Sequence, residues 1–240
     1  MFNLIRIESF KLKRFTPFYY SLLFVAVLMS QMIWKGLNQN AVAYWGYSCM
    51  HDGFVEGVQD CSLAFLFGML IAWYVGADFS ERTLHRALTT GTKRWMIIVT
   101  KIIATSILTF IIHLFEILIN VIAYGKEFGF SFEGFGSRDL LWLGVVALQM
   151  LAYNVFFVLI SVICGNIYSA LFACVAVSAI CGNALRNLFV GNYIYEHSFF
   201  CFAKSSQNSD LIPCAICAII ALIILVTATI VVFNKRDVAN

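Results

Sequence analysis

The sequence predicts an all-α polytopic membrane protein with six transmembrane helices. Hydrophobic residues make up 61% of the 240 residues and charged residues only 12%, whereas a soluble domain is about half apolar and a quarter charged. Six apolar stretches are long enough to cross a bilayer as helices. Only two prolines occur in the chain, which fits long uninterrupted helices. We therefore expect residues 1–240 to form a single transmembrane domain.

The first sixteen residues alternate basic and apolar side chains. Arg6, Lys11, Lys13 and Arg14 lie among leucine, isoleucine and phenylalanine residues. No small-residue cleavage site follows, and the next apolar segment is too long for the core of a signal peptide. Residues 1–16 are therefore expected to form a basic helix on a membrane surface.

The connections between the apolar segments are polar, glycine-rich or very short. Cys164-Gly165-Asn166 is short enough to make the fourth and fifth spans antiparallel neighbours. The segments 38–60, 124–139 and 191–210 are expected to be polar loops. The six expected spans are residues 17–37, 61–77, 95–123, 140–163, 168–190 and 211–233.

The third helix is longer than a bilayer needs. From Thr92 to Ala123 it would run about 48 Å, against a hydrocarbon core of about 30 Å. Lys101 lies inside it, and a lysine is costly at the centre of a membrane. We expect the first two or three turns of this helix to protrude from the membrane.

A polar stretch separates the second and third spans and predicts a short helix over residues 78–91. Asp78, followed by Glu81 three residues later, matches the aspartate form of a capping box. The apolar residues that follow share one helical face. Gly91 stands where a helix-terminating glycine is common, and Thr92 can cap the next helix.

Basic residues lie mainly on one side of the expected topology. With an even number of spans both termini share a side, and the positive-inside rule makes that side cytoplasmic. Five basic residues lie in the opposite loops or near their span ends, at positions 35, 126, 138, 186 and 204. The cytoplasmic set is Arg6, Lys11, Lys13, Arg14, Arg82, Arg86, Lys93, Arg94, Lys235 and Arg236.

Three polar residues share one face of the third span. His113, Glu116 and Asn120 have the spacing i, i+3, i+7. Ionisable groups inside a membrane usually face the bundle interior or a wet cavity. Two interpretations stay open: a polar lining of a substrate path, or a His–Glu pair that satisfies itself and fixes helix packing. Asn154 in the fourth span is a further path candidate, and an interhelical hydrogen bond is the other interpretation of that residue.

No catalytic or metal-binding motif is present in the sequence. The Gly125-Lys126 pair lacks the earlier glycine of a phosphate loop, and no Gly-x-Ser-x-Gly or His-Glu-x-x-His occurs. Cys49 and His51 have no second ligand pair. The eight cysteines do not form a disulfide framework. A bridge stays open only among the cysteines able to face outward, which are Cys49, Cys61, Cys201 and Cys214.

One segment resembles the signature of the ABC type-2 transporter permeases. It comprises Gly76-Ala77-Asp78-Phe79-Ser80-Glu81-Arg82-Thr83-Leu84, then Gly91-Thr92-Lys93-Arg94, then Lys101. Arg82 replaces the glycine that is commoner before Thr-Leu in that family. Glu8-x-x-Lys11 and the closing Phe233-Asn234-Lys235-Arg236-Asp237 are also similar to the family's ends.

The resemblance implies the permease subunit of a bacterial ABC exporter, with both termini cytoplasmic in the cell membrane. A separate ATPase dimer would hold ATP and Mg, so this chain would bind no cofactor and carry no catalytic residue. Its partners would be that ATPase, a second identical or different permease, and the bilayer, but no nucleic acid. Residues 78–91 would be the coupling helix and 191–210 a small external gate. The expected cargo is an amphipathic or antimicrobial peptide.

The resemblance also assigns roles to residues of the coupling segment. Glu81, Arg82, His85 and Arg86 would contact the ATPase. The full set expected to serve coupling is Asp78, Glu81, Arg82, Thr83, Leu84, His85, Arg86, Leu88 and Arg94. The main alternative is an ion- or proton-coupled secondary transporter or channel that uses the His113/Glu116 face. A membrane enzyme would lack any recognisable catalytic group, and a sensor or anchor would bind some other partner through the 78–94 segment.

Overall fold

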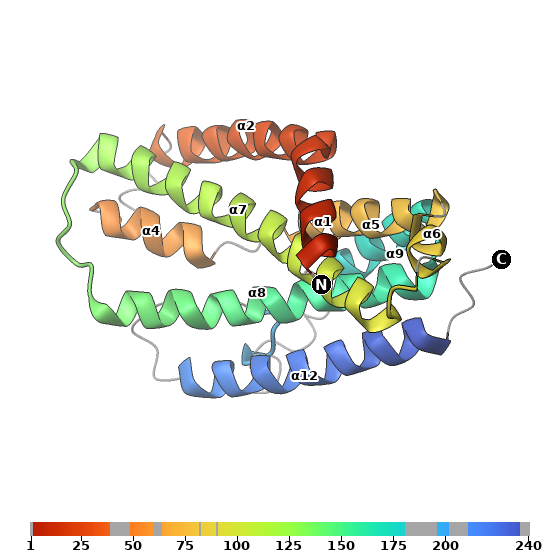
Figure 1. The fold of residues 1–240 in the computed structure, drawn as a ribbon. Coiled ribbons are helices and arrows are strands. Elements are labelled where there is room, and N and C mark those ends of the chain that lie inside the picture. Colours follow the sequence, from red (N-terminus) through yellow and green to blue (C-terminus); the bar gives the residue numbers. More distant parts are fainter. Residues whose placement is uncertain are drawn as a thin grey trace.

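The computed structural model of the protein describes residues 2–38, 49–59, 64–81, 83–89, 91–180, 196–201 and 211–235. Within these ranges the chain is helical and contains no strand, which confirms the all-α prediction. The helices, in chain order (Figure 1), are α1 (Phe2–Arg14), α2 (Thr16–Asn38), α4 (Met50–Gln59), α5 (Ala64–Ser80), α6 (Thr83–Thr89), α7 (Arg94–Phe128), α8 (Ser137–Cys164), α9 (Ile167–Ala179) and α12 (Leu211–Lys235).

The long helices α7, α8 and α12 run along the length of the molecule (Figure 1), and α8 packs against both of the others. Helices α2 and α4 lie on α7, whereas α5 and α9 pack against each other and against α8. The short helix α6 and the end of α12 lie at one end of the bundle. The connection from α7 to α8 lies at the other end.

Three of the described helices are long and apolar enough to cross a membrane, namely α7, α8 and α12. Helices α1 and α2 meet at a bend of 52° and would add a fourth crossing if the pair counts as one span. Helices α5 and α9 are apolar but shorter, with 17 and 13 residues. Every expected span overlaps a helix. Residues 181–190 of the fifth span and most of the expected external gate, except 196–201, lie outside the described residues.

Helix α4 lies where the sequence predicts a polar loop, so that expectation is wrong for Met50–Gln59. Its glycines allow the backbone to approach α7 closely. A Cβ at Gly57 would lie 2.9 Å from the Cα of Ile117, and one at Gly53 would lie 2.9 Å from the carbonyl oxygen of Asn120. Small residues four positions apart are a common device for packing membrane helices.

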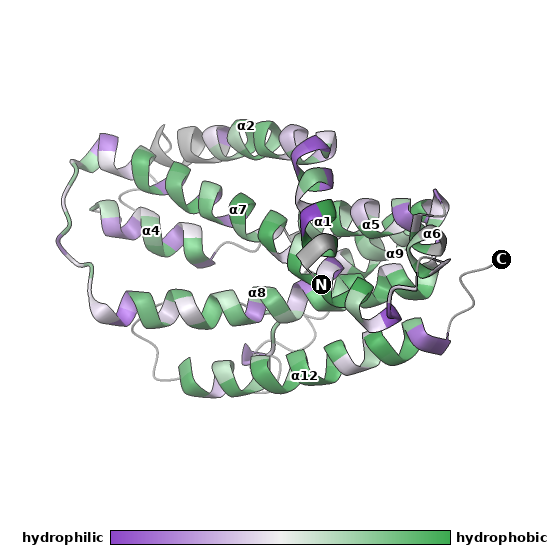
Figure 2. Ribbon diagram, in the orientation of Figure 1, coloured by the Kyte–Doolittle hydropathy of each residue, from purple (hydrophilic) through white to green (hydrophobic). Residues whose placement is uncertain are grey.

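Helix α7 has two chemically different faces, and Figure 2 shows the dominance of apolar residues along it. One face is exposed and entirely aliphatic, as expected of a surface in contact with lipid. Its residues are Ile103, Ile107, Ile111, Leu114, Leu118 and Ile122. The opposite face is buried and carries a polar stripe from Lys101 to Asn120. The stripe comprises Lys101, Thr105, Thr109, His113, Glu116 and Asn120.

Candidate functional site

The polar stripe of α7 begins in a buried cluster of charges that joins three helices. The ammonium group of Lys101 lies 2.9 Å from the carboxylate of Glu8 in α1 and also pairs with the carboxylate of Asp78 in α5. Lys101 is only 2% exposed. A buried charge is tolerated when it is paired and hydrogen-bonded, so the two carboxylates explain how a lysine fits in this apolar helix.

A second cation and a phenol complete the cluster. Lys11 binds Asp78 at 2.8 Å, and the hydroxyl of Tyr74 donates a hydrogen bond to Glu8. The ammonium of Lys101 also lies 4.7 Å from the centroid of the Tyr74 ring, a cation–π contact. Two cations thus face two carboxylates, and the formal charges of the cluster balance.

Helical periodicity accounts for this arrangement. Glu8 and Lys11 are three residues apart on α1, and Tyr74 and Asp78 are four apart on α5, so each pair projects from one face of its helix. No cluster of this kind is evident from the sequence alone. The signal that points to it is Lys101, because a lysine inside an apolar helix requires a counter-charge, and Glu8 is an acidic residue in an otherwise basic segment.

The charge cluster extends directly to helix α6. The hydroxyl of Thr83, the first residue of α6, donates to Asp78 Oδ1 at 2.6 Å. Leu84 is buried at 4% exposure and Leu88 packs against the core, so one face of α6 rests on the bundle. Asp78 therefore contacts, through its one carboxylate, the first turn of α6 as well as α1 and α7.

The structure corrects the expected limits of the short helix. Residues as far as Ser80 belong to α5, so α6 begins at Thr83 and Asp78 is not its N-cap in the expected sense. Helix α7 is preceded by Lys93 without a side-chain hydrogen bond, so Thr92 does not cap it. Gly91 has a φ of 82°, in the left-handed region that favours glycine after a helix.

Of the other expected coupling residues, the structure describes the side chains of Arg94 and Glu81 but not those of the remaining three. Arg94 donates to the carbonyl oxygens of Phe233 and Asn234, at 3.2 and 3.1 Å, and so joins the start of α7 to the end of α12. Glu81 is exposed. The expected contact residues Arg82, His85 and Arg86 have side chains that lie outside the described part of the structure.

The face of α7 that carries His113, Glu116 and Asn120 is buried. His113 Nδ1 lies 3.1 Å from Glu116 Oε2, and the amide of Asn120 donates to the backbone carbonyl of Glu116 at 3.1 Å. All three are at most 4% exposed. Gly57 of α4 packs against Asn120. The His–Glu pair of the packing interpretation is therefore formed, and α4 covers part of the face on which a substrate path was expected.

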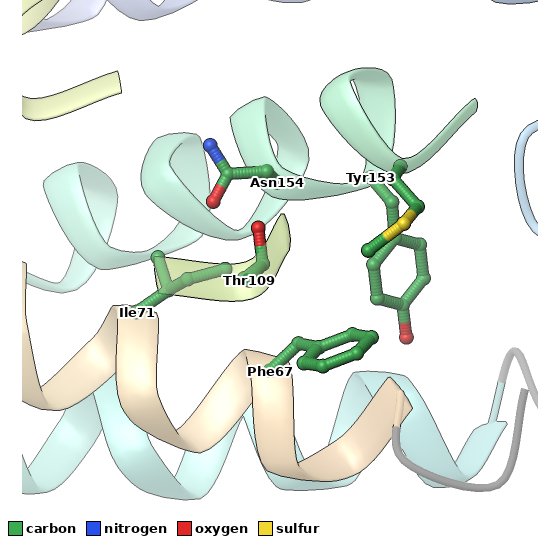
Figure 3. Close-up of a pocket in the computed structure, with 6 residues that line it drawn as sticks. Phe67, Ile71, Thr109, Tyr153 and Asn154 are labelled. Atoms are coloured by element: carbon green, nitrogen blue, oxygen red, sulfur yellow. The ribbon is translucent and has the colours of Figure 1, made fainter. Parts of the chain in front are cut away.

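Asn154 lies apart from that pair and links α8 to α7. Its amide donates to the hydroxyls of Thr105 and Ser106, at 3.1 and 2.8 Å. It also borders a crevice between α5, α7 and α8, which is shown in Figure 3 and is too narrow for a water molecule. The residues that line this crevice are Phe67, Ile71, Thr109, Met150, Tyr153 and Asn154.

Among the described residues, no group of three or more His, Cys, Asp or Glu side chains could hold a metal ion. The thiol of Cys49 lies 3.4 Å from Asp52, and His51 is 3.4 Å from Asp139. Cys61 and Cys181 lie outside the described residues. The described cysteines, all free, are Cys49, Cys164, Cys174, Cys201, Cys214 and Cys217.

Comparison with known proteins adds no family assignment. No protein-family model, curated protein or solved structure matches the chain. The charge cluster and its link to α6 therefore carry the functional argument.

Proposed function

We propose that the protein is the membrane-spanning permease subunit of an ATP-driven exporter, with six spans and with α6 as the helix that receives the movement of a separate ATPase. The observation that carries this proposal is the position of Asp78. Its carboxylate binds Lys101 of α7, Lys11 of α1 and Thr83 at the start of α6. A displacement of α6 would pull on this carboxylate. The movement would therefore be transmitted to α1, α5 and α7.

Two further features support the proposal. Helix α6 has seven residues, which is too short for stability in isolation, so its position depends on the bundle beneath it. The chain also has no phosphate loop, so energy from ATP would have to come from another chain. The exporter would pair with a second permease, act in a bacterial cell membrane and carry an amphipathic peptide.

Reversing the charges of α6 tests the proposal. We expect Arg82→Glu combined with Arg86→Glu to abolish co-purification of the ATPase with the tagged full-length chain, because two cations opposite a protein partner become anions. The measurement is affinity purification from the producing cells, with the ATPase identified by mass spectrometry and by its ATP hydrolysis.

The control carries Lys126→Glu and Arg138→Glu, the same change in charge at the opposite end of α7 and α8. It should retain the ATPase. Retention of the ATPase with unchanged, transport-linked hydrolysis in the α6 double variant would overturn the coupling role. Loss in both variants would instead point to a general failure of folding.

The buried His113–Glu116 pair favours one alternative, an ion- or proton-coupled secondary transporter or channel. An imidazole 3.1 Å from a carboxylate inside an apolar helix can hold a proton that a gradient would drive through the bundle. In proteoliposomes that contain this chain without any ATPase, such a transporter would still move its cargo and would stop when the proton gradient is dissipated. An ATP-driven permease would show no transport in either condition.

A further inference from the structure

Helix α1 has an outer face, directed away from the bundle, on which cations and apolar side chains lie side by side. Arg6, Lys13 and Arg14 are exposed, and between them Ile7 and Phe10 are 53% and 56% exposed. The one acidic residue of α1, Glu8, is buried at 8% exposure in the charge cluster. Among the described residues no ion pair joins Arg6, Lys13 or Arg14 to a carboxylate, so the outer face of α1 carries net positive charge.

The charge cluster fixes the rotation of α1 that produces this face. Glu8 and Lys11 are held inward by Lys101 and Asp78, and the ring of Phe15 packs edge-on against Tyr74 at 5.2 Å. Rotation of α1 about its axis would break these contacts. The outward direction of Arg6 and Lys13 is thus a consequence of the buried ion pairs.

Neighbouring residues are of the kind found where a membrane meets water. The guanidinium of Arg14 lies 4.3 Å from the centroid of the Phe10 ring, so charge and apolar surface adjoin on α1. Tyr19 and Tyr20, at the start of α2, are 53% and 68% exposed, and the hydroxyl of Tyr19 donates to the backbone carbonyl of Lys13. Exposed tyrosines of this kind concentrate where a membrane meets water.

We propose that the outer face of α1 binds the anionic phospholipid headgroups of the bilayer, with Arg6 and Lys13 as the principal headgroup ligands. Cations beside exposed apolar side chains match a surface that is negatively charged above an apolar layer, which is an anionic leaflet. A soluble acidic partner would satisfy the cations but would leave Ile7 and Phe10 without an apolar contact. This inference does not depend on the proposed export function.

The test measures lipid retained by the full-length protein. Wild-type protein is incorporated into nanodiscs of equal phosphatidylglycerol and phosphatidylcholine content, and the lipids that remain bound after release are counted by native mass spectrometry. We expect a preference for phosphatidylglycerol in the wild type. Arg6→Gln with Lys13→Gln should weaken that preference about tenfold or more, since each basic residue near an anionic surface contributes about 1 kcal/mol.

Two controls separate lipid binding from other effects. Lys126→Gln with Arg138→Gln removes the same charge at the far end of the bundle and should leave the preference unchanged. Arg6→Lys with Lys13→Arg keeps the charge and should retain it. A wild type without preference for phosphatidylglycerol, or a double variant that keeps it, overturns the proposal. If the double variant keeps its lipids but loses a protein partner, the surface is a protein-docking site instead.

Discussion

Lys101 is a buried cation, so the residues packed around it must supply negative charge. An ammonium group at 2% exposure cannot be hydrated, so its charge depends on the carboxylates of Glu8 and Asp78. Neither residue is near it in the sequence, and they lie on different helices. The lysine thereby stabilises one particular packing of α1, α5 and α7.

Removal of the ammonium should destabilise the protein strongly. Lys101→Met keeps much of the side-chain volume but leaves two buried carboxylates with Lys11 as the one cation that pairs with the cluster among the described residues. We expect a loss of about 3–5 kcal/mol in unfolding free energy, the usual result of removing one partner from a buried pair. Thermal unfolding in detergent, followed by circular dichroism, measures the effect.

Neutralising the carboxylates as well should restore most of the loss. In Lys101→Met with Glu8→Gln and Asp78→Asn no buried charge remains unpaired, because the side chain of Lys11 is 36% exposed and can reach water. A triple variant as unstable as the single one would show that Lys101 acts through packing rather than charge.

At the scale of elements, α4 and α6 owe their positions to contacts with their neighbours. Neither is long enough to be stable in isolation, since α4 has 10 residues and α6 has seven. Helix α6 depends on Thr83 and Leu84, whereas α4 depends on Gly53 and Gly57. Each element thus has a small number of residues at which substitution should release it from the bundle.

Gly57→Ala should loosen α4 from α7. The added methyl group would lie 2.9 Å from the Cα of Ile117, and backbone cannot move aside as a flexible side chain can. Overpacking of this kind typically costs about 1–3 kcal/mol. Hydrogen–deuterium exchange of the α4 amides, together with thermal unfolding, should detect both the local and the global effect.

Gly144→Ala is the matched control, because a Cβ at Gly144 of α8 meets no atom within 4 Å. There the higher helix propensity of alanine should leave stability unchanged or raise it by up to about 1 kcal/mol. If Gly57→Ala were as neutral as Gly144→Ala, the close contact of α4 with α7 would not determine the position of α4.

For the whole molecule, the arrangement of the ends gives a topology that can be tested. Helix α6 and the end of α12 lie at one end of the bundle, and the α7–α8 connection lies at the other (Figure 1). Lys93 and Arg94, at the start of α7, and Lys235, which ends α12, belong to the first end, where Arg94 joins the two helices. From the positive-inside rule we expect that end to be cytoplasmic and both termini to share that side.

Short epitope tags test this topology. A tag inserted after Phe132, which is 84% exposed in the α7–α8 connection, should bind antibody on intact spheroplasts. Tags at either terminus should bind only after the membrane is permeabilised. Labelling of all three sites under the same condition would contradict the arrangement.

The helical class, the approximate helix positions and the residues that need special surroundings can be predicted from the amino-acid sequence. These features follow from local composition: long apolar runs, a glycine after α6, and a lysine inside an apolar segment. The sequence does not predict α4, because Met50–Gln59 is too short and polar to be distinguished from a loop. The role of its glycines follows only from their close contact with α7.

Which charged residues pair with each other depends on the packing of separate helices. Glu8 and Lys101 are separated by 93 positions in the chain, and only the packing of α1 against α7 brings them together. Packing also makes Asp78 the centre of the charge cluster instead of the expected helix cap, and it buries Asn120 against Gly57 of α4. The physical reason is that local sequence fixes which face of a helix is polar. The partner of that face depends on how separate helices bury their surfaces together.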